Sequence, residues 1–294
     1  MFKCFSLCLF CGTLSLAATD VVILGTGTPR ADPDRSGPAV AIIYNGRSYL
    51  FDSGPGIVRR AAAASTRLHI DALKMPNLQR VFLTHLHSDH TLGLPDLIFS
   101  PWVLGRTVPL EIYGPKGSKA MADHIEAAWQ PDIDIRIHGL EHGNSTGYQA
   151  NVHEINPGLV FTENGIEIAA ISVHHGTWPQ AFGYRIKTPD RTIVISGDCS
   201  PSPALIEACN GCDVLLHEVY SLSELKSARP NWAEYLHQFH TSTEEVAQIA
   251  AQAKPKLLVL YHQLMTGGTD LQLVSEVKTG PETKVVSARD LDVF

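Results

Sequence analysis

Short apolar runs recur along this chain and predict a protein rich in β-strands. Many of these runs end close to a turn-forming residue such as glycine, proline, asparagine or aspartate. In the first half, strands are predicted at residues 21–24, 39–44, 48–51, 81–83 and 110–113. In the second half, they are predicted at residues 160–162, 166–173, 182–187, 192–196, 214–216 and 257–261, followed by a last helix and strand.

Longer stretches typical of helices separate many of these strands. The alanine-rich stretch at residues 57–66 is an example. Helices are predicted at residues 57–66, 96–103, 116–129, 203–209 and 243–253. Strands that alternate with helices indicate an α/β fold, and the two strand-rich halves suggest a duplicated αββα sandwich.

Short turns fix the pairing of several strands. Asn45-Gly46 and Asn164-Gly165 each join two apolar runs, which is the pattern of a β-hairpin, and a further hairpin is predicted around residues 188–191. Residues 25–29 (Gly-Thr-Gly-Thr-Pro) lack the third glycine of a dinucleotide-binding loop, and the prolines that follow exclude a helix. We therefore interpret this stretch as a tight loop.

The strand predicted at residues 81–83 is followed by a dense group of metal-binding residue types. His85, His87, Asp89 and His90 occupy four of six consecutive positions. Because side chains alternate along an extended segment, His85 and His87 should point to one side together. A turn after them can direct Asp89 and His90 toward a second point, so the segment fits two adjacent metal ions.

Four side chains from one segment cannot complete two metal sites, so further ligands must come from other strand ends. Candidates directly after predicted strands are His174 or His175, Asp198, and His262. Alternation along the preceding strand would turn His174 outward. The histidines with no metal spacing are interpreted as structural: His69, His124, His138, His142, His153 and His237.

Residues 84–90 (Thr-His-Leu-His-Ser-Asp-His) resemble the signature of the metallo-β-lactamase-fold hydrolases. Residues 91–96 (Thr-Leu-Gly-Leu-Pro-Asp) are similar to the branch that holds ribonuclease Z, arylsulfatases and some phosphodiesterases. The Leu-Gly-Thr-Gly sequence at residues 24–27 is similar to the opening strand of that branch. The resemblance implies an α/β fold with a four-layer αββα sandwich and a binuclear metal centre.

By this resemblance, the metal ligands divide into two sets joined by one bridging acid. The first metal would bind His85, His87 and His175, the second Asp89, His90 and His262, with Asp198 between them. His175 is preferred to His174 because His-Gly-x-x-x-x-x-Phe-Gly-Tyr, which begins at His175, resembles the family's run before its Gly-Tyr-Arg strand. Nitrogen and carboxylate donors favour two divalent ions, with zinc first and manganese or iron as alternatives.

Two further elements have counterparts in the family. Ser242 and Glu245 have capping-box spacing, so His240 precedes the positive end of a helix. The resemblance implies that His240 is a general acid or oxyanion stabiliser supported by Glu218, the alternative being a structural histidine. Asp52, otherwise a turn residue, would orient a metal-bound histidine. The predicted catalytic residues are Asp89, Asp198, Glu218 and His240.

One stretch of the chain and four aromatic residues are expected to shape the substrate pocket. Residues 139–158 are polar and without clear period, and we interpret them as a surface insertion near the mouth of the site. Trp102, Trp178, Tyr220 and Trp232 fall in or beside the predicted site loops, which suggests an aromatic-lined pocket, although core packing explains each of them equally well.

Composition and charge predict a cellular location for the protein and argue against one class of binding partner. Residues 1–18 carry one charge, Lys3, before an apolar run and a small-residue exit, as in a cleaved secretory signal. Residues 19–294 would then be a single hydrolase domain, secreted or periplasmic, with no membrane segment after signal removal. An untrimmed cytoplasmic N-terminus is the alternative. The net charge of −7 argues against nucleic acid as a partner.

Three cysteines remain once those of the signal are removed. Cys209 and Cys212 could form a small disulfide or half of a zinc site, while Cys199 stands alone. No second pair completes a tetrahedral zinc site, so we expect two packed thiols.

These observations predict an exported binuclear hydrolase whose metal-bridging hydroxide attacks small phosphodiesters or sulfate esters. The alternative is a ribonuclease Z-like endonuclease on RNA, of the tRNA 3′-end processing type. The tight hairpin at residues 188–191 argues against that alternative, because tRNA-processing relatives carry a long tRNA-gripping arm at this place. A non-catalytic metal-binding module would need neither Asp89 nor a bridging Asp198. The sequence does not set the oligomeric state, and a homodimer is compatible with it.

Overall fold

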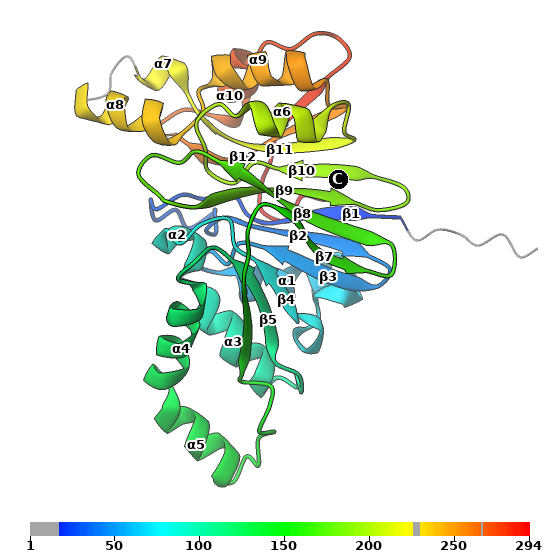
Figure 1. Ribbon diagram of the computed structural model, residues 1–294, viewed down its shortest axis with the longest axis vertical. Helices are drawn as coiled ribbons and strands as arrows, with labels where there is room; N and C mark the ends of the chain where they lie inside the picture. Colours follow the sequence, from blue (N-terminus) through cyan, green and yellow to red (C-terminus); the bar gives the residue numbers. More distant parts are fainter. Residues whose placement is uncertain (1–17, 226–229, 266) are drawn as a thin grey trace, which may run out of the picture.

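The computed structural model describes residues 18–225, 230–265 and 267–294, and within these residues two β-sheets lie face to face (Figure 1). The first sheet follows the order of the chain: β1 (Asp20–Gly25), β2 (Ala39–Tyr44), β3 (Arg47–Phe51), β4 (Arg80–Phe82), β5 (Leu110–Gly114) and β6 (Ala150–Glu154). The second sheet also keeps chain order: β7 (Gly158–Glu163), β8 (Ile166–Val173), β9 (Ala181–Lys187), β10 (Thr192–Ile195), β11 (Val214–Tyr220), β12 (Leu257–Leu264) and β13 (Lys284–Ser287).

Helices cover the outer side of each sheet (Figure 1). On the side of the first sheet lie α1 (Ile57–Arg67), η1 (Asp71–Leu73), η2 (Met75–Asn77), α3 (Leu94–Val103), α4 (Ser118–Ala128) and α5 (Gln130–His138). On the side of the second sheet lie α6 (Pro203–Cys209), α7 (Leu222–Leu225), α8 (Pro230–Phe239), α9 (Thr243–Ala253) and α10 (Asp270–Glu276). The short α2 (Ser88–Thr91) follows β4. This arrangement of helix, sheet, sheet and helix confirms the predicted αββα sandwich.

The central strands are buried on both faces, which explains their continuous apolar sequences. Along β1, Val22 and Leu24 join the core beneath α1 and α3. Val21 and Ile23 point the other way, into the core between the two sheets. A third core lies between the second sheet and helices α6 and α9. Three apolar layers therefore hold the four structural layers together.

Parallel pairing positions the functional residues. Strands β3, β4, β5 and β6 run parallel, as do β10, β11, β12 and β13. The carboxyl ends of parallel strands meet at one edge of a sheet, and loops at that edge commonly carry a binding site. Asp52 follows β3, and residues 85–90 follow β4. Asp198 follows β10 at the corresponding edge of the second sheet.

Local turn signals correctly predicted the hairpins. Asn45 and Gly46 both have positive φ, of 50° and 70°, and pair Tyr44 with Arg47 across a two-residue turn. The Asn164-Gly165 turn joins β7 to β8 in the same way. The structure also contains α5, β6, α7 and α8, which the apolar patterns did not predict.

The expectation that residues 139–158 form an insertion near the mouth of the site is wrong for most of the stretch. The stretch contains β6, which pairs in parallel with β5, and its alternating Tyr148, Ala150 and Val152 pack on the first core. The backbone before β6 is tied to α3, since the Trp102 indole donates to the Asn144 carbonyl at 2.8 Å. Figure 1 places α5 and this connection at the end of the molecule remote from α2.

Cys209 and Cys212 form a disulfide, whereas the sequence favoured two free thiols. The intervening Asn210 and Gly211 both have positive φ, of 32° and 82°, and turn the chain back on itself at the end of α6. This turn brings the two Cα atoms within 4.7 Å, close enough for a disulfide. Cys199 is a free, buried cysteine.

Residues 1–17, which hold nearly all of the expected signal segment, lie outside the described residues. Within the described residues, no helix combines the length and apolar character needed to cross a bilayer.

Arg106 is a fully buried cation that ties together the outer part of the first half. Its guanidinium donates to four backbone carbonyls, those of Leu78, Leu97, Ile98 and Gly147, at 2.6–2.9 Å. No carboxylate pairs with it among the described residues. Burial lowers its pKa to about 10, so it stays charged at neutral pH.

Replacing Arg106 with methionine should lower the free energy of unfolding by about 3–5 kcal/mol, because four buried carbonyls lose their donors. Urea unfolding followed by circular dichroism measures this loss. Arg59, whose side chain is 83% exposed, supplies the control, and Arg59→Met should change stability by less than about 0.5 kcal/mol. Equal stabilities of the two variants would contradict the structural role of Arg106.

Candidate metal centre

The loop after β4 brings the first group of polar side chains to the edge of the sheet. His85 and His87 lie between the end of β4 and α2, and Asp89 and His90 lie in α2 itself. Asp52, which has a strained φ of 60°, fixes this loop from the neighbouring strand end. Its carboxylate accepts hydrogen bonds from the Thr84 backbone N–H at 2.7 Å and the Thr84 hydroxyl at 2.9 Å.

The second sheet supplies the remaining candidates from three separate segments. His175 follows β8 and is fully buried, whereas the adjacent His174 is exposed, as alternation predicted. Asp198 follows β10 and is also buried. His262 lies within β12, and not after it as the sequence suggested.

A β-bulge directs His262 into the site. In the pairing of β11 with β12, Glu218 pairs with Tyr261 and Val219 pairs with Gln263, so His262 is the extra residue. Its φ of 45° departs from the extended conformation of its neighbours. The bulge therefore aims His262 at Asp198, with 3.1 Å between Nε2 and Oδ2.

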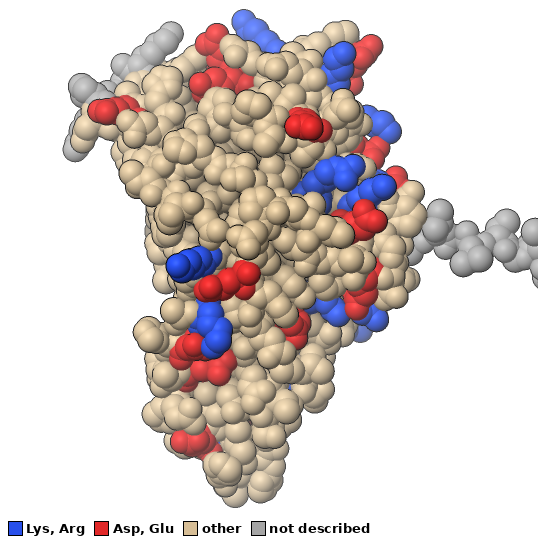
Figure 2. Space-filling view, viewed as in Figure 1, with Lys and Arg blue, Asp and Glu red and all other residues tan. Residues whose placement is uncertain are grey.

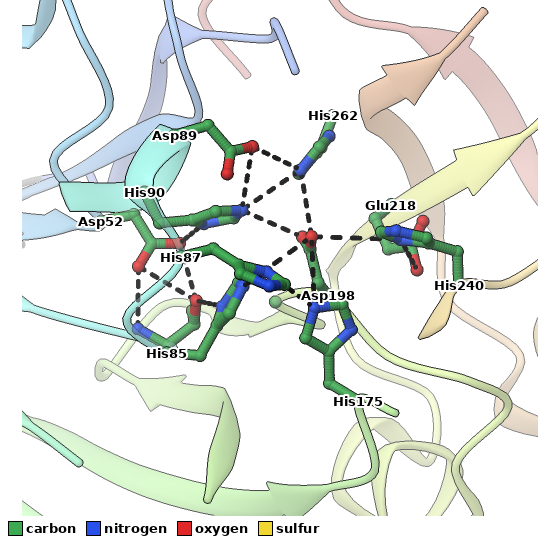
Figure 3. Close-up of polar contacts among 12 residues, drawn as sticks. Asp52, His85, His87, Asp89, His90, His175, Asp198, Glu218, His240 and His262 are labelled. Carbon is green, nitrogen blue, oxygen red and sulfur yellow. Dashed lines mark hydrogen bonds and ion pairs between the residues drawn. The ribbon is translucent and has the colours of Figure 1, made fainter. Parts of the chain in front are cut away.

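The side chains converge as two adjoining groups (Figure 3). The donor atoms within each group lie within 4.8 Å of one another: His85, His87, His175 and Asp198 in one, and Asp89, His90 and His262 in the other. Asp198 also lies 3.3 Å from His90 Nε2 and 4.0 Å from both His85 Nε2 and His175 Nε2. It thus contacts both groups, in the arrangement expected of a bridging ligand.

For three of these histidines, a hydrogen bond to one ring nitrogen leaves the other free to bind a cation. The Nδ1 atoms of His85, His90 and His175 are engaged by the Thr84 hydroxyl, the Asp52 carboxylate and the Phe239 carbonyl at 2.7–2.9 Å. Their Nε2 atoms therefore face the centre. Such outer hydrogen bonds orient metal-binding histidines in many proteins.

The distances between nitrogens also fit metal ions. His85 Nε2 and His175 Nε2 lie 2.9 and 3.1 Å from His87 Nδ1. His90 Nε2 lies 3.2 Å from His262 Nε2. Imidazole lone pairs aimed at one another repel unless a proton or cation lies between them, so this donor set fits two divalent cations.

The pKa values of the histidines also differ between the two groups. Burial lowers the pKa of His85 well below its usual value and lowers that of His175 to about 4, so both are neutral and able to bind metal. Burial would also lower the pKa of His262, but Asp198 and Asp89 outweigh it and raise the value to about 10. The two aspartates therefore create a site that favours positive charge, where a metal ion competes with a proton.

His240 and Glu218 form a buried pair beside this centre. His240 Nδ1 lies 3.3 Å from Glu218 Oε1 and 3.9 Å from Asp198 Oδ2. Glu218 Oε1 also accepts hydrogen bonds from the backbone N–H groups of Thr241 and Cys199. The predicted capping box at the start of α9 is present, because Ser242 and Glu245 exchange hydrogen bonds. His240 is therefore held with its other ring nitrogen available to a ligand.

A cavity of about 570 Å³ opens from this centre. Residues of the centre that line it are His87, Asp89, Asp198, His240 and His262. The other walls come from the loop after β1, from α7 and α8, and from the end of β12. A substrate could therefore place a reacting ester against the metal centre and a larger group between these walls.

The four aromatic residues singled out from the sequence have different environments. Tyr220 and Trp232 line the cavity. The Trp178 indole donates to His87 Nε2 at 2.7 Å. Trp102 is instead buried in the outer core of the first half, as a core residue would be.

Sequence reasoning missed Tyr235 and Leu236, which line the cavity from α8. The aromatic residues Trp232, Tyr235 and Phe239 have the three- and four-residue spacing of one helix face, a signal that could have identified α8. The six histidines interpreted as structural are absent from the metal-binding groups among the described residues. His153, for example, pairs with Glu111 at the surface.

Comparison with known proteins gives concordant results. Residues 47–263 match the beta-lactamase superfamily domain. A ribonuclease Z of Mycobacterium marinum is 31% identical over 247 residues, which cover 83% of this chain and 85% of that protein. A ribonuclease Z of Mycobacterium sp. strain KMS is 32% identical over 248 residues, which cover 83% of this chain and 84% of that protein.

Solved structures extend the similarity to the whole sandwich. Human tRNase Z, short form, superimposes with a TM-score of 0.67 and 26% identity over 94% of this chain and 98% of that chain. The metallo-β-lactamase fold protein YhfI from Bacillus subtilis has a TM-score of 0.72 over 94% of this chain and 98% of that chain. With 18% identity, this second likeness concerns the fold alone.

Proposed function

The chain belongs to the beta-lactamase superfamily of metal-dependent hydrolases, and from this premise we propose that its natural substrates are phosphodiesters. The observation that carries the proposal is the position of Asp198 between two groups of buried histidine and aspartate side chains. Relatives named ribonuclease Z support phosphodiesters over the sulfate esters that the sequence also suggested.

The residues of the centre would have different roles in hydrolysis. Two bound divalent ions would supply an activated water and polarise the phosphoryl group. Asp198 would orient both ions, and Asp52 would keep His90 aimed at them. His240, held by Glu218, would donate a proton to the departing oxygen or stabilise charge on the phosphoryl group.

RNA is the first candidate substrate, because the relatives that cover most of this chain are ribonucleases by name. This runs against the expectation, drawn from the net charge, that nucleic acid is not a partner. A small phosphodiester is the second candidate, favoured by the cavity and by the tight connection between β9 and β10. On the face shown in Figure 2, basic residues are interspersed with acidic ones and form no continuous basic patch.

A substrate panel tests the proposal on purified, metal-loaded protein. We expect hydrolysis of bis(p-nitrophenyl) phosphate, with little hydrolysis of p-nitrophenyl sulfate, and loss of activity after chelation that zinc or manganese restores. Faster cleavage of precursor tRNA than of the small diester would identify RNA as the substrate, and the reverse would favour a small molecule. Activity confined to sulfates, lactones or β-lactams would contradict the proposal.

The identity of the metal and the cellular location stay predictions. We propose zinc, because the donors are histidine nitrogens and carboxylates, and metal analysis of the purified protein tests this choice. We also propose export, from the apolar segment expected to act as a signal, and fractionation of expressing cells tests that proposal.

A further inference from the structure

Three aromatic side chains of α8 form a stack that reaches the metal centre. The ring centroids of Trp232 and Tyr235 lie 4.9 Å apart with an interplanar angle of 19°. Those of Tyr235 and Phe239 lie 4.5 Å apart at 22°. At its inner end, Phe239 meets His175 edge to face at 5.1 Å, while Tyr235 meets His240 at 5.6 Å.

The stack is anchored to the loop that carries His175. The Phe239 carbonyl accepts the hydrogen bond from His175 Nδ1 at 2.7 Å, and the Gly176 N–H donates to the Gln238 carbonyl at 3.1 Å. A Cβ atom on Gly176 would clash with the Phe239 ring, and the φ of 53° at this position also favours glycine. This close approach fixes α8 relative to the centre.

The geometry of the stack leaves different surfaces of each ring available. Trp232 and Phe239 lie one turn before and one turn after Tyr235, so they cover opposite faces of its ring. Tyr235 can therefore offer only its edge and its hydroxyl to the cavity that it lines. Within the described residues that hydroxyl has no hydrogen-bond partner, and burial raises its pKa to about 12, so it remains a donor.

Trp232 has one ring face left for a ligand. Tyr235 covers one side of the indole, yet the residue remains 47% exposed and lines the cavity. Around it, Tyr220, Leu225 and Leu236 supply largely apolar surface. Outside the metal centre, Arg30 and Glu224 are the charged side chains among the described residues of the lining, and their charges are opposite. The cavity therefore suits an uncharged group better than a second phosphate.

We propose that Trp232 and Tyr235 form a subsite for an uncharged planar group of the substrate, either a nucleobase or an aryl group. The planar group stacks on the open face of Trp232, while the Tyr235 hydroxyl donates a hydrogen bond to a phosphoryl oxygen held at the centre. The subsite rests on the proposed phosphodiesterase function and names the chemistry that the cavity recognises. Stacking of this kind is tolerant of the identity of the ring.

Calorimetry with three phosphate monoesters tests the subsite on full-length, metal-loaded protein. Phenyl phosphate or uridine monophosphate should bind about tenfold more tightly than methyl phosphate, because only the first two carry a ring that can stack. Trp232→Ala should abolish this preference. Tyr235→Phe should weaken binding of all three ligands by similar factors, because the hydroxyl contacts the phosphoryl group that they share.

Trp129→Ala is the matched control. Trp129 is 41% exposed and stacks on one aromatic neighbour, Phe99, at the end of α4 on the outer side of the first sheet. This variant should keep the full preference for rings. Tighter binding of uridine monophosphate than of phenyl phosphate identifies a nucleobase, and the reverse identifies an aryl group.

Two outcomes would overturn the subsite: equal binding of all three monoesters by the unaltered protein, or a ring preference that survives in Trp232→Ala. Hydrolysis of bis(p-nitrophenyl) phosphate by the same preparation separates this result from the proposed function. Turnover without ring preference refutes the subsite alone. Absence of turnover of both this diester and precursor tRNA refutes the proposed function, and the calorimetric comparison still decides whether the cavity binds rings.

Discussion

Asp198→Ala is expected to abolish turnover and to reduce the bound metal. Asp198 lies close to donors of both groups, at 4.0 Å from His85 Nε2 in the first and 3.1 Å from His262 Nε2 in the second. Its removal would separate the two metal positions and leave several buried donors without a common partner. Loss of several kcal/mol of transition-state stabilisation corresponds to a decrease in kcat of roughly 10³-fold or more.

Steady-state kinetics and metal analysis of the same preparations measure both effects. His174→Ala provides the control, because His174 is exposed and lies next to a buried candidate ligand, His175. That variant should retain most of its metal and activity. Equal losses in the two variants would mean that the ligand has been assigned to the wrong histidine.

His240→Ala is expected to lower kcat by about 10²–10⁴-fold, the usual contribution of general acid catalysis, while leaving the metal content unchanged. His240 lies beside Asp198 and outside both metal-binding groups. Its contact with Glu218 holds one ring nitrogen and leaves the other facing the cavity.

The leaving group reveals which role His240 plays. A general acid matters most for poor leaving groups, so loss of activity should be larger for an alkyl ester than for a p-nitrophenyl ester. His237→Ala is the control, since His237 is an exposed histidine of the preceding helix, α8. Metal loss in His240→Ala, or a similar decrease in His237→Ala, would contradict the assignment.

Much of the fold could be predicted because local signals and tertiary structure agree. The bounds of β2, α6 and α9 coincide with those expected, since turn residues, Pro203 and the Ser242 cap mark their ends. The metal-binding segment is equally local, because the spacing of His85, His87, Asp89 and His90 is enough to identify it.

Other features depend on contacts that no local pattern contains. The β-bulge at His262 arises from pairing with β11, so the sequence suggested that the strand ends at Tyr261. Residues 139–158 contain an edge strand whose partner, β5, lies far earlier in the chain. Trp232 of α8 was identified from the sequence, but Tyr235 and Leu236 of the same helix were missed, because α8 itself was not predicted.

Both halves of the chain contribute candidate metal ligands to the centre. Residues 85–90 come from the first sheet, whereas His175, Asp198 and His262 come from the second. Metal ions bound between the two sheets would stabilise the sandwich, because ions that bind only the folded state increase its free energy of unfolding. Metal binding and the packing of the two sheets against each other would then be thermodynamically linked. The metal-free protein would therefore be less stable than the metal-bound protein.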